Sequence, residues 1–90
     1  MPQAVVDPEE LRQFAHSLKK FNAQLRDKAA ALGNQLATLS ASWRDQEQKK
    51  FMEAFAQTSK VLGNFLEASH QHASFLGKKA TLIEDYLKQR

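Results

Sequence analysis

Reactive side chains are present in this sequence, but their spacing favours neither a catalytic nor a metal centre. The 90 residues include no Cys and three His, at positions 16, 70 and 72. His70 and His72 are two residues apart, so on a helix they face different sides and cannot chelate one ion as an i,i+4 pair does. Ser, His and Asp also occur, but a chain of long helices offers no concave pocket that excludes water. We therefore predict a non-enzymatic protein with no catalytic residue, no metal ligand and no cofactor.

His72 falls among apolar positions opposite Phe14, and the sequence leaves two interpretations of it open. In the first, its protonation near pH ~6.5 would loosen a dry helical seam. In the second, it is bonded to a nearby hydroxyl or is partly hydrated, because buried polar groups are normally satisfied.

Charge is spread evenly along the chain, which argues against nucleic acid as a partner. The formal net charge is +3, and the segments 1–39, 40–60 and 61–90 each have one more basic than acidic residue. No basic block is therefore available to follow a phosphate backbone. No stretch of ~20 apolar residues predicts a membrane span. The first ten residues do not resemble a cleaved signal peptide, so we expect synthesis in the cytoplasm without one.

The composition predicts an all-α protein. Ala, Leu, Glu, Lys and Arg make up 43 of the 90 residues, whereas Val, Ile and Thr together make up 7; the former favour helix and the latter strand. Asp7 and Pro8 form a strong helix start, and Asp45 with Gln48 resembles a capping box. We predict one domain over residues 1–90, with a flexible tail at 1–6, helices at about 8–40 and 45–88, and a Trp-containing turn at 40–45.

Heptad spacing predicts how the two helices pair. Leu recurs every seven residues from Leu11 to Leu39; Phe14 and Phe21 fall three positions after Leu of this series, and Ala29 and Leu36 four positions after. An antiparallel register in which paired residue numbers sum to about 87 matches this stripe with the second helix. The predicted hairpin core comprises Leu11, Phe14, Leu18, Phe21, Leu25, Leu32, Leu36, Leu39, Phe51, Phe55, Leu62, Phe65 and Leu76.

The second helix is apolar over a wider arc than one neighbour can cover. A two-helix hairpin has no enclosed interior, and a chain of this size without disulfides or metal commonly relies on oligomerisation. We therefore predict that two hairpins form a four-helix bundle. The predicted dimer interface comprises Val61, Leu66, Phe75, Leu82, Ile83 and Leu87.

The turn resembles that of a known family. Trp43-Arg44-Asp45 stands where the WXG family of small, early-secreted-antigen-like substrates of type VII (ESX) secretion has Trp-x-Gly, with Leu39 four residues before the Trp and Phe51 eight after it. The resemblance covers the whole chain in length and architecture. Asp45 replaces the family's Gly. The family's C-terminal signal, Tyr-x-x-x-Asp/Glu, would begin at Tyr86, but Arg90 stands at the acidic position.

This resemblance implies a secreted or secretion-associated protein that works as a homodimer or as a heterodimer with a sister hairpin. It also implies that Trp43, Arg44, Asp45 and Tyr86 contribute to a composite signal read by a secretion ATPase. The alternative is an intracellular helical adaptor or structural coiled-coil dimer unrelated to secretion. A nucleic-acid-associated basic protein is a third interpretation, which the even charge distribution disfavours.

Overall fold

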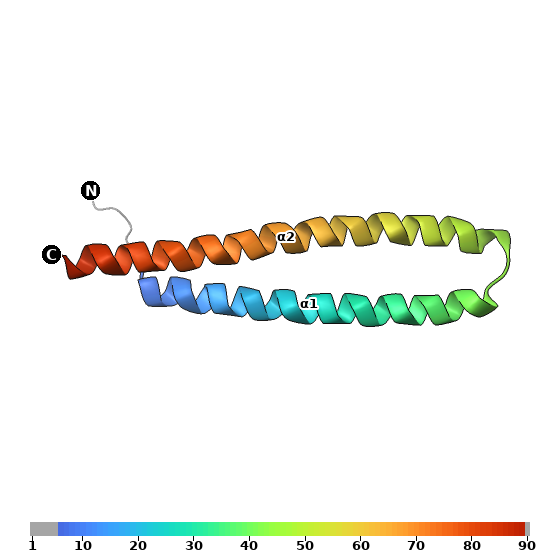
Figure 1. Cartoon of the computed structure of the whole chain (residues 1–90), viewed down its shortest axis with the longest axis horizontal. Coiled ribbons are helices and arrows are strands. Elements are labelled where there is room, and N and C mark those ends of the chain that lie inside the picture. The colour runs from blue at the N-terminus through green and yellow to red at the C-terminus, as the bar shows by residue number, and fades with distance from the viewer. Residues whose placement is uncertain (1–5, 90) are drawn as a thin grey trace.

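The chain folds as one long antiparallel helical hairpin (Figure 1). The computed structural model describes residues 6–89, in which helix α1 spans Pro8–Ser42 and helix α2 spans Gln46–Lys88. The hairpin measures 68 × 22 × 14 Å. The all-α prediction is confirmed, and the described residues contain no strand. Of the predicted N-terminal tail, only Val6 lies within the described residues.

Both helices begin at an aspartate whose side chain binds free backbone N–H groups. Asp7 accepts a hydrogen bond from the Glu9 N–H at 2.9 Å, and Pro8 occupies the first helical position. Asp45 does the same for α2, which begins one residue later. Such caps satisfy donors that have no partner within the helix. The connecting segment is shorter than predicted, because α1 continues through Ser42.

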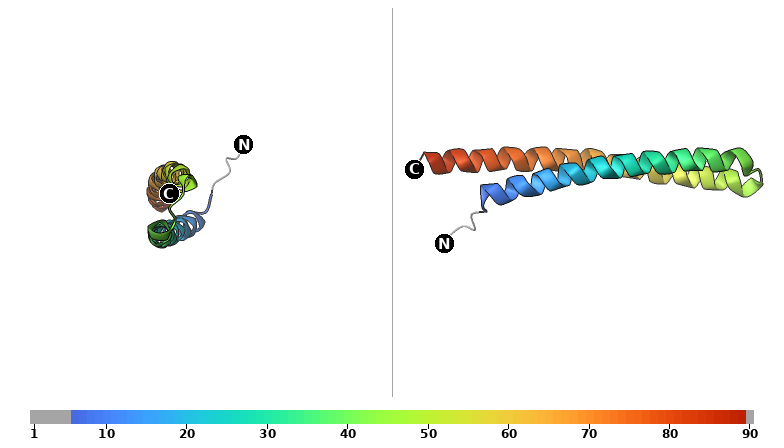
Figure 2. Two further views of the ribbon diagram at one scale, coloured as in Figure 1. Left: turned by 90° about the vertical axis from the view of Figure 1, so that its right-hand side faces the viewer. Right: turned by 90° about the horizontal axis from the view of Figure 1, so that it is seen from below.

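The seam between the helices is narrow and partly built of small residues. The helices cross at a shallow angle along their length (Figure 2). Ala73 and Ala80 are almost fully buried, at 1% and 0% exposure, and Ala15 is also buried. Small side chains let the two helix axes approach closely. The centre of the seam is polar: Ser69 Oγ donates a 2.8 Å hydrogen bond to Asn22 Oδ1, and both residues are buried.

Burial divides the predicted hairpin core into two sets. Seven of its members are half-buried in the seam: Leu11, Leu18, Leu25, Leu36, Phe55, Leu62 and Leu76. Six are exposed, so their predicted burial within the hairpin is wrong: Phe14, Phe21, Leu32, Leu39, Phe51 and Phe65. In α1 the residues four positions after Leu11 and Leu18, namely Ala15 and Asn22, are buried, whereas the Phe residues three positions after them flank the seam.

The predicted dimer interface also needs correction at one position. Leu66 is buried at 9% exposure, and because it lies one heptad before Ala73 we assign it to the intrachain seam. Ile83 is half-buried. The other four predicted members remain exposed on the surface of the single hairpin: Val61, Phe75, Leu82 and Leu87.

Candidate protein-interaction site

The connection between the helices is held by all three residues of the Trp-Arg-Asp motif. The Trp43 backbone N–H donates to the Leu39 carbonyl at 3.0 Å, which closes the last turn of α1. The Arg44 guanidinium donates to the Ala41 carbonyl at 3.3 Å. Asp45 caps α2, so each motif residue satisfies a backbone group at a helix end.

Asp45 also fixes the side chain of Trp43. A single carboxylate oxygen, Oδ1, accepts from the Trp43 indole Nε1 at 2.8 Å and from the Glu47 and Gln48 backbone N–H groups at 3.0 and 3.2 Å. The Trp43 ring is half-buried and packs against the Phe51 ring, with centroids 5.7 Å apart and planes tilted by 42°. Tilted pairs at this separation are a favourable aromatic arrangement.

The aromatic contacts continue from the turn along α2. Phe51 and Phe55 have centroids 5.9 Å apart at a tilt of 39°. Phe55 also lines a groove of about 230 Å³. Leu25 and Leu32 line this groove from α1, and Phe55 and Leu62 line it from α2. The pairs Leu25–Leu62 and Leu32–Phe55 line this groove as the predicted register requires.

A second and larger apolar groove lies nearer the open end of the hairpin. It has a volume of about 450 Å³. Phe14 and Leu18 line it from α1, and Phe65, Phe75 and Leu76 line it from α2. Phe14, Phe65 and Phe75 are 59%, 48% and 61% exposed, so these rings form its walls without being covered by the chain itself.

Heptad spacing places both grooves on one face of the hairpin. Lys28, which lines the smaller groove, lies two heptads after Phe14, and Thr58 lies one heptad before Phe65. Residues at such spacing share a side of a helix that pairs with a partner. We call this surface the Phe face; its exposed large side chains are Phe14, Phe21, Leu32, Phe51, Val61, Phe65 and Phe75.

The other side of the seam has a different character. The depression there is lined by Lys19 from α1 and, from α2, by Ala73, Ser74, Gly77, Lys78, Thr81 and Leu82. Lysine and hydroxyl side chains therefore accompany the apolar atoms on this side, whereas exposed aromatic rings gather on the other. Large apolar side chains gathered on one side are the pattern expected of a helix pair that contacts a further element there. An apolar patch of this extent commonly marks an interaction site.

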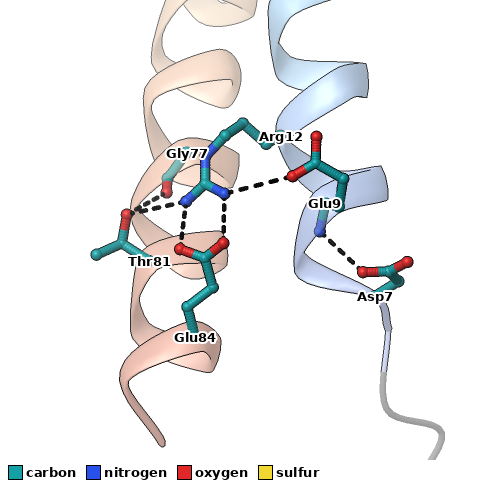
Figure 3. A network of polar contacts seen from close by, with 6 residues as sticks. All are labelled: Asp7, Glu9, Arg12, Gly77, Thr81 and Glu84. Atoms are coloured by element: carbon teal, nitrogen blue, oxygen red, sulfur yellow. Dashed lines mark hydrogen bonds and ion pairs between the residues drawn. The ribbon is translucent and has the colours of Figure 1, made fainter. Parts of the chain in front are cut away.

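At the open end, Arg12 ties the start of α1 to the last turns of α2 (Figure 3). Its guanidinium makes two hydrogen bonds to the Glu84 carboxylate, at 2.6 and 2.9 Å, and a third to Thr81 Oγ1 at 3.4 Å. Glu9 Oε1 lies 3.9 Å from the same guanidinium, and Thr81 also donates to the Gly77 carbonyl. A bidentate arginine–carboxylate pair fixes orientation as well as distance.

This ion pair changes the proton affinity of both partners. The hydrogen bonds from Arg12 lower the pKa of the Glu84 carboxyl, against a smaller opposing effect of desolvation. Glu84 in turn raises the pKa of Arg12. Both side chains remain partly exposed, at 40% and 35%, so solvent screens the pair and it acts mainly as a positioning contact.

Tyr86 does not meet the Trp43 turn within one chain. It is 66% exposed and belongs to the last turns of α2. That end of α2 lies opposite the connection between the helices (Figure 1). Leu87 beside it is 42% exposed. The C-terminal end of α2 extends past the first turn of α1, so this stretch has no facing helix in the hairpin.

Two polar contacts across the hairpin were not predictable from the sequence. Asn22–Ser69 and Arg12–Glu84 join residues 47 and 72 positions apart, a separation for which a single sequence carries no direct signal. The only hint is that Asn22 falls at heptad spacing from Ala15 and Ala29. His72 is exposed and lines the larger groove, so it is not part of a dry seam and the first interpretation of this residue is wrong.

Residues 6–89 contain no candidate membrane span and no candidate metal site. Neither helix contains a stretch long and apolar enough to cross a membrane. No cluster of three or more His, Asp or Glu side chains forms a candidate metal site in this part of the chain. The fold and the surface define a small helical hairpin with one apolar face and a tryptophan at its bend.

The family follows from comparison with known proteins. Residues 3–86 match the model of WXG100, described as proteins of 100 residues with WXG, and the chain belongs to this family. Its fold is similar to that of the secreted protein EsxB from Bacillus anthracis strain Sterne. The wild-type crystal structure has a TM-score of 0.79 at 21% identity, covering 90% of this chain and 87% of that one. A selenomethionine-labelled form has a TM-score of 0.81 at 20% identity, covering 96% and 98%. A comparison with curated protein sequences finds no match.

Proposed function

We propose that the protein is a non-enzymatic substrate or secretion partner of a type VII (ESX-like) system, and that it acts as a dimer of helical hairpins. The partner is a second copy of the chain or a sister hairpin. Membership of the WXG100 family and the likeness to a secreted protein support this proposal. The observation that carries it is the Phe face, which the chain leaves uncovered.

The dimensions of the Phe face suit a partner hairpin. The hairpin's two longest dimensions are 68 and 22 Å, and the outline that they define is larger than the about 800 Å² of surface that each partner buries in a standard interface. Its exposed aromatic rings are the residue type that dominates binding energy at interfaces. The two apolar grooves, which residues of both α1 and α2 line, can receive side chains of a second helix pair.

An antiparallel dimer would unite the two ends of the site. In that arrangement the bend of one hairpin lies beside the C-terminal end of the other, so Trp43, Arg44 and Asp45 would approach the partner's copy of the segment around Tyr86. The exposed Tyr86 and Leu87 would then be covered. We propose that this junction is the composite signal recognised by a secretion ATPase, and that the protein leaves the cytoplasm by this route.

Light scattering on the purified chain, combined with one face-directed variant, tests the dimer. We expect a mass of about 20 kDa, twice the 10.2 kDa of one chain. Replacing Phe75 with Ser should reduce the mass towards one chain at micromolar concentration, because an anchor of the larger groove is lost. Lys78→Ser, three residues further along α2 on the polar side, is the matched control and should keep the dimer. Dimers of equal affinity in both variants would contradict the proposed interface.

Export is tested separately in a host that has a type VII system. Trp43→Ala should reduce the chain in the medium while the amount within the cells is maintained. Unchanged export of this variant would contradict the role given to Trp43 and favour a helical adaptor unrelated to secretion.

A further inference from the structure

We infer that Asp45 is a positioning residue for Trp43: one carboxylate oxygen starts α2 and holds the indole N–H, so that the bend presents only the apolar ring to its partner. The positioning itself is a property of the single chain. Its consequence for recognition rests on the function proposed above.

The backbone at Asp45 explains why the family's glycine is dispensable here. Asp45 has φ −99° and ψ −179°, which is an extended conformation open to any residue. Within the described residues no position has a positive φ. The bend therefore does not use the left-handed freedom that only glycine supplies without strain, and a side chain at position 45 is accommodated.

That side chain contributes an acceptor that glycine lacks. Oδ1 of Asp45 receives the Trp43 indole N–H at 2.8 Å in addition to two backbone N–H groups of the first turn of α2. An ionised acceptor makes shorter and stronger hydrogen bonds than a neutral one. The negative charge also lies at the positive end of the α2 dipole, where it is stabilised. The carboxylate is thus held by the helix and in turn holds the indole.

The consequence concerns the chemistry of whatever binds the bend. An indole has one polar atom, its N–H donor, and in this chain that donor is already paired inside the turn. Phe51 supports one side of the ring at a centroid distance of 5.7 Å. A partner therefore meets an oriented hydrocarbon surface, and the matching pocket is apolar and does not have to supply an acceptor. Orienting the ring beforehand also reduces the entropy lost on binding.

Three substitutions at position 45 separate positioning from capping. Asp45→Asn keeps a side-chain oxygen at the same distance from the backbone and should preserve both roles. Asp45→Ser keeps a good helix cap, but its shorter side chain cannot reach the indole. Asp45→Gly removes the shared acceptor, and with it both roles, and restores the family's residue. Asp7→Ser is the matched control, because Asp7 caps α1 without contacting Trp43.

The readout is the indole N–H of Trp43, which is the only Trp in the chain. In NMR spectra of the purified protein, we expect the indole proton of Asp45→Ser and Asp45→Gly to exchange with solvent about tenfold faster than in the parent. We expect Asp45→Asn and Asp7→Ser to stay within twofold of it. Parent-like exchange in Asp45→Ser would overturn the positioning role, since the cap alone would then account for Asp45.

A second readout tests the consequence for binding independently. If the positioned ring is what the partner recognises, Asp45→Ser lowers export in a host with a type VII system, while Asp45→Asn and Asp7→Ser do not. Faster indole exchange with unchanged export would overturn the recognition step and leave the positioning intact. Loss of export in Trp43→Ala, but not in Asp45→Ser, would likewise overturn the recognition step without contradicting the proposed function.

Discussion

The buried hydrogen bond between Ser69 and Asn22 provides a sharp prediction about stability. Ser69→Ala removes the donor and leaves Asn22 Oδ1 without its 2.8 Å partner at a position that is only 5% exposed. A buried acceptor that loses its partner costs about 1–3 kcal/mol of folding free energy. For a domain of this size that corresponds to a decrease in melting temperature of about 5–15 °C.

The double variant Asn22→Leu/Ser69→Ala should behave differently from the single one. It removes both polar groups and replaces the amide with an aliphatic side chain of similar size, an exchange that is close to neutral when both partners of a buried hydrogen bond are replaced. We expect it to recover most of the stability lost in Ser69→Ala. The cycle is completed by Asn22→Leu alone, which leaves the Ser69 hydroxyl unpaired.

Circular dichroism melts at one fixed protein concentration measure these differences, because the midpoint of a dimer depends on concentration. Thr38→Ala is the control: its exposed hydroxyl bonds only to the Asn34 carbonyl of its own helix, so the change should stay within about 0.5 kcal/mol. The reasoning is refuted if Ser69→Ala is as mild as Thr38→Ala, or if the double variant is as unstable as Ser69→Ala.

Three further predictions concern other parts of the hairpin. Glu84→Gln should speed amide hydrogen exchange over residues 81–88. In the parent, Arg12 lowers the pKa of Glu84, so the ion pair stabilises the fold above the carboxyl's unfolded-state pKa of about 4.5, and this stabilisation is lost as the pH falls through the folded-state pKa. The variant should lack this loosening in acid. Equal pH profiles of parent and variant in hydrogen-exchange mass spectrometry would contradict the role given to the Arg12–Glu84 pair. Ala80→Leu should lower the unfolding free energy by about 1–3 kcal/mol in urea titrations, because a fully buried Ala in the seam has no room for a larger side chain; an unchanged midpoint would show that the seam is looser than described. Truncation after Asp85 keeps the Glu84 pair but removes Tyr86 and Leu87, and should weaken dimerisation and shift Trp43 fluorescence to the red; parent-like affinity and emission would refute the antiparallel junction.

The helix ends were predictable because their determinants are local. Asp7 followed by Pro8, and Asp45 followed three residues later by Gln48, are capping patterns that act within a few residues of the chain. The structure uses both aspartates as caps. The extent of α1 beyond residue 40 was not predictable from its Ser residues, since Ser40 and Ser42 bond to carbonyls of their own helix instead of capping a new one.

The phase of the seam was only half predictable. Heptad spacing selects the Leu11–Leu18–Leu25 series, which is half-buried in the structure, but the neighbouring positions at three and four residues further on compete for the same face. By hydrophobicity alone, Phe14 would be buried in the seam in preference to Ala15, yet the structure buries Ala15 and leaves Phe14 exposed. Two helices that pack closely need small residues between them, while the larger Phe rings remain at the flank. Choosing between them requires knowing whether another surface covers that flank.

The register predicted from the sequence does not reveal which polar side chains meet across the hairpin, because it gives neither their reach nor their rotamers. In the register predicted, Asp7 lies beside residue 80, so Glu84 would fall in the part of α2 beyond α1. The long Arg12 side chain nevertheless reaches it. Such reach comes from side-chain length and rotamer rather than from the helical pattern. The same holds for the indole of Trp43, which donates to the Asp45 carboxylate two residues further along the chain.

The concentration dependence of the melting temperature tests the central claim, that the Phe face is covered by a partner hairpin, most directly. If two copies of this chain unfold as one cooperative unit, the midpoint should rise by several degrees as the protein concentration increases a hundredfold, because mass action favours the folded dimer. If a sister hairpin is needed instead, the chain alone should melt without cooperativity and gain a concentration-dependent transition when the sister is added. A sharp transition of the isolated chain, with a midpoint that is the same at every concentration, would contradict the account.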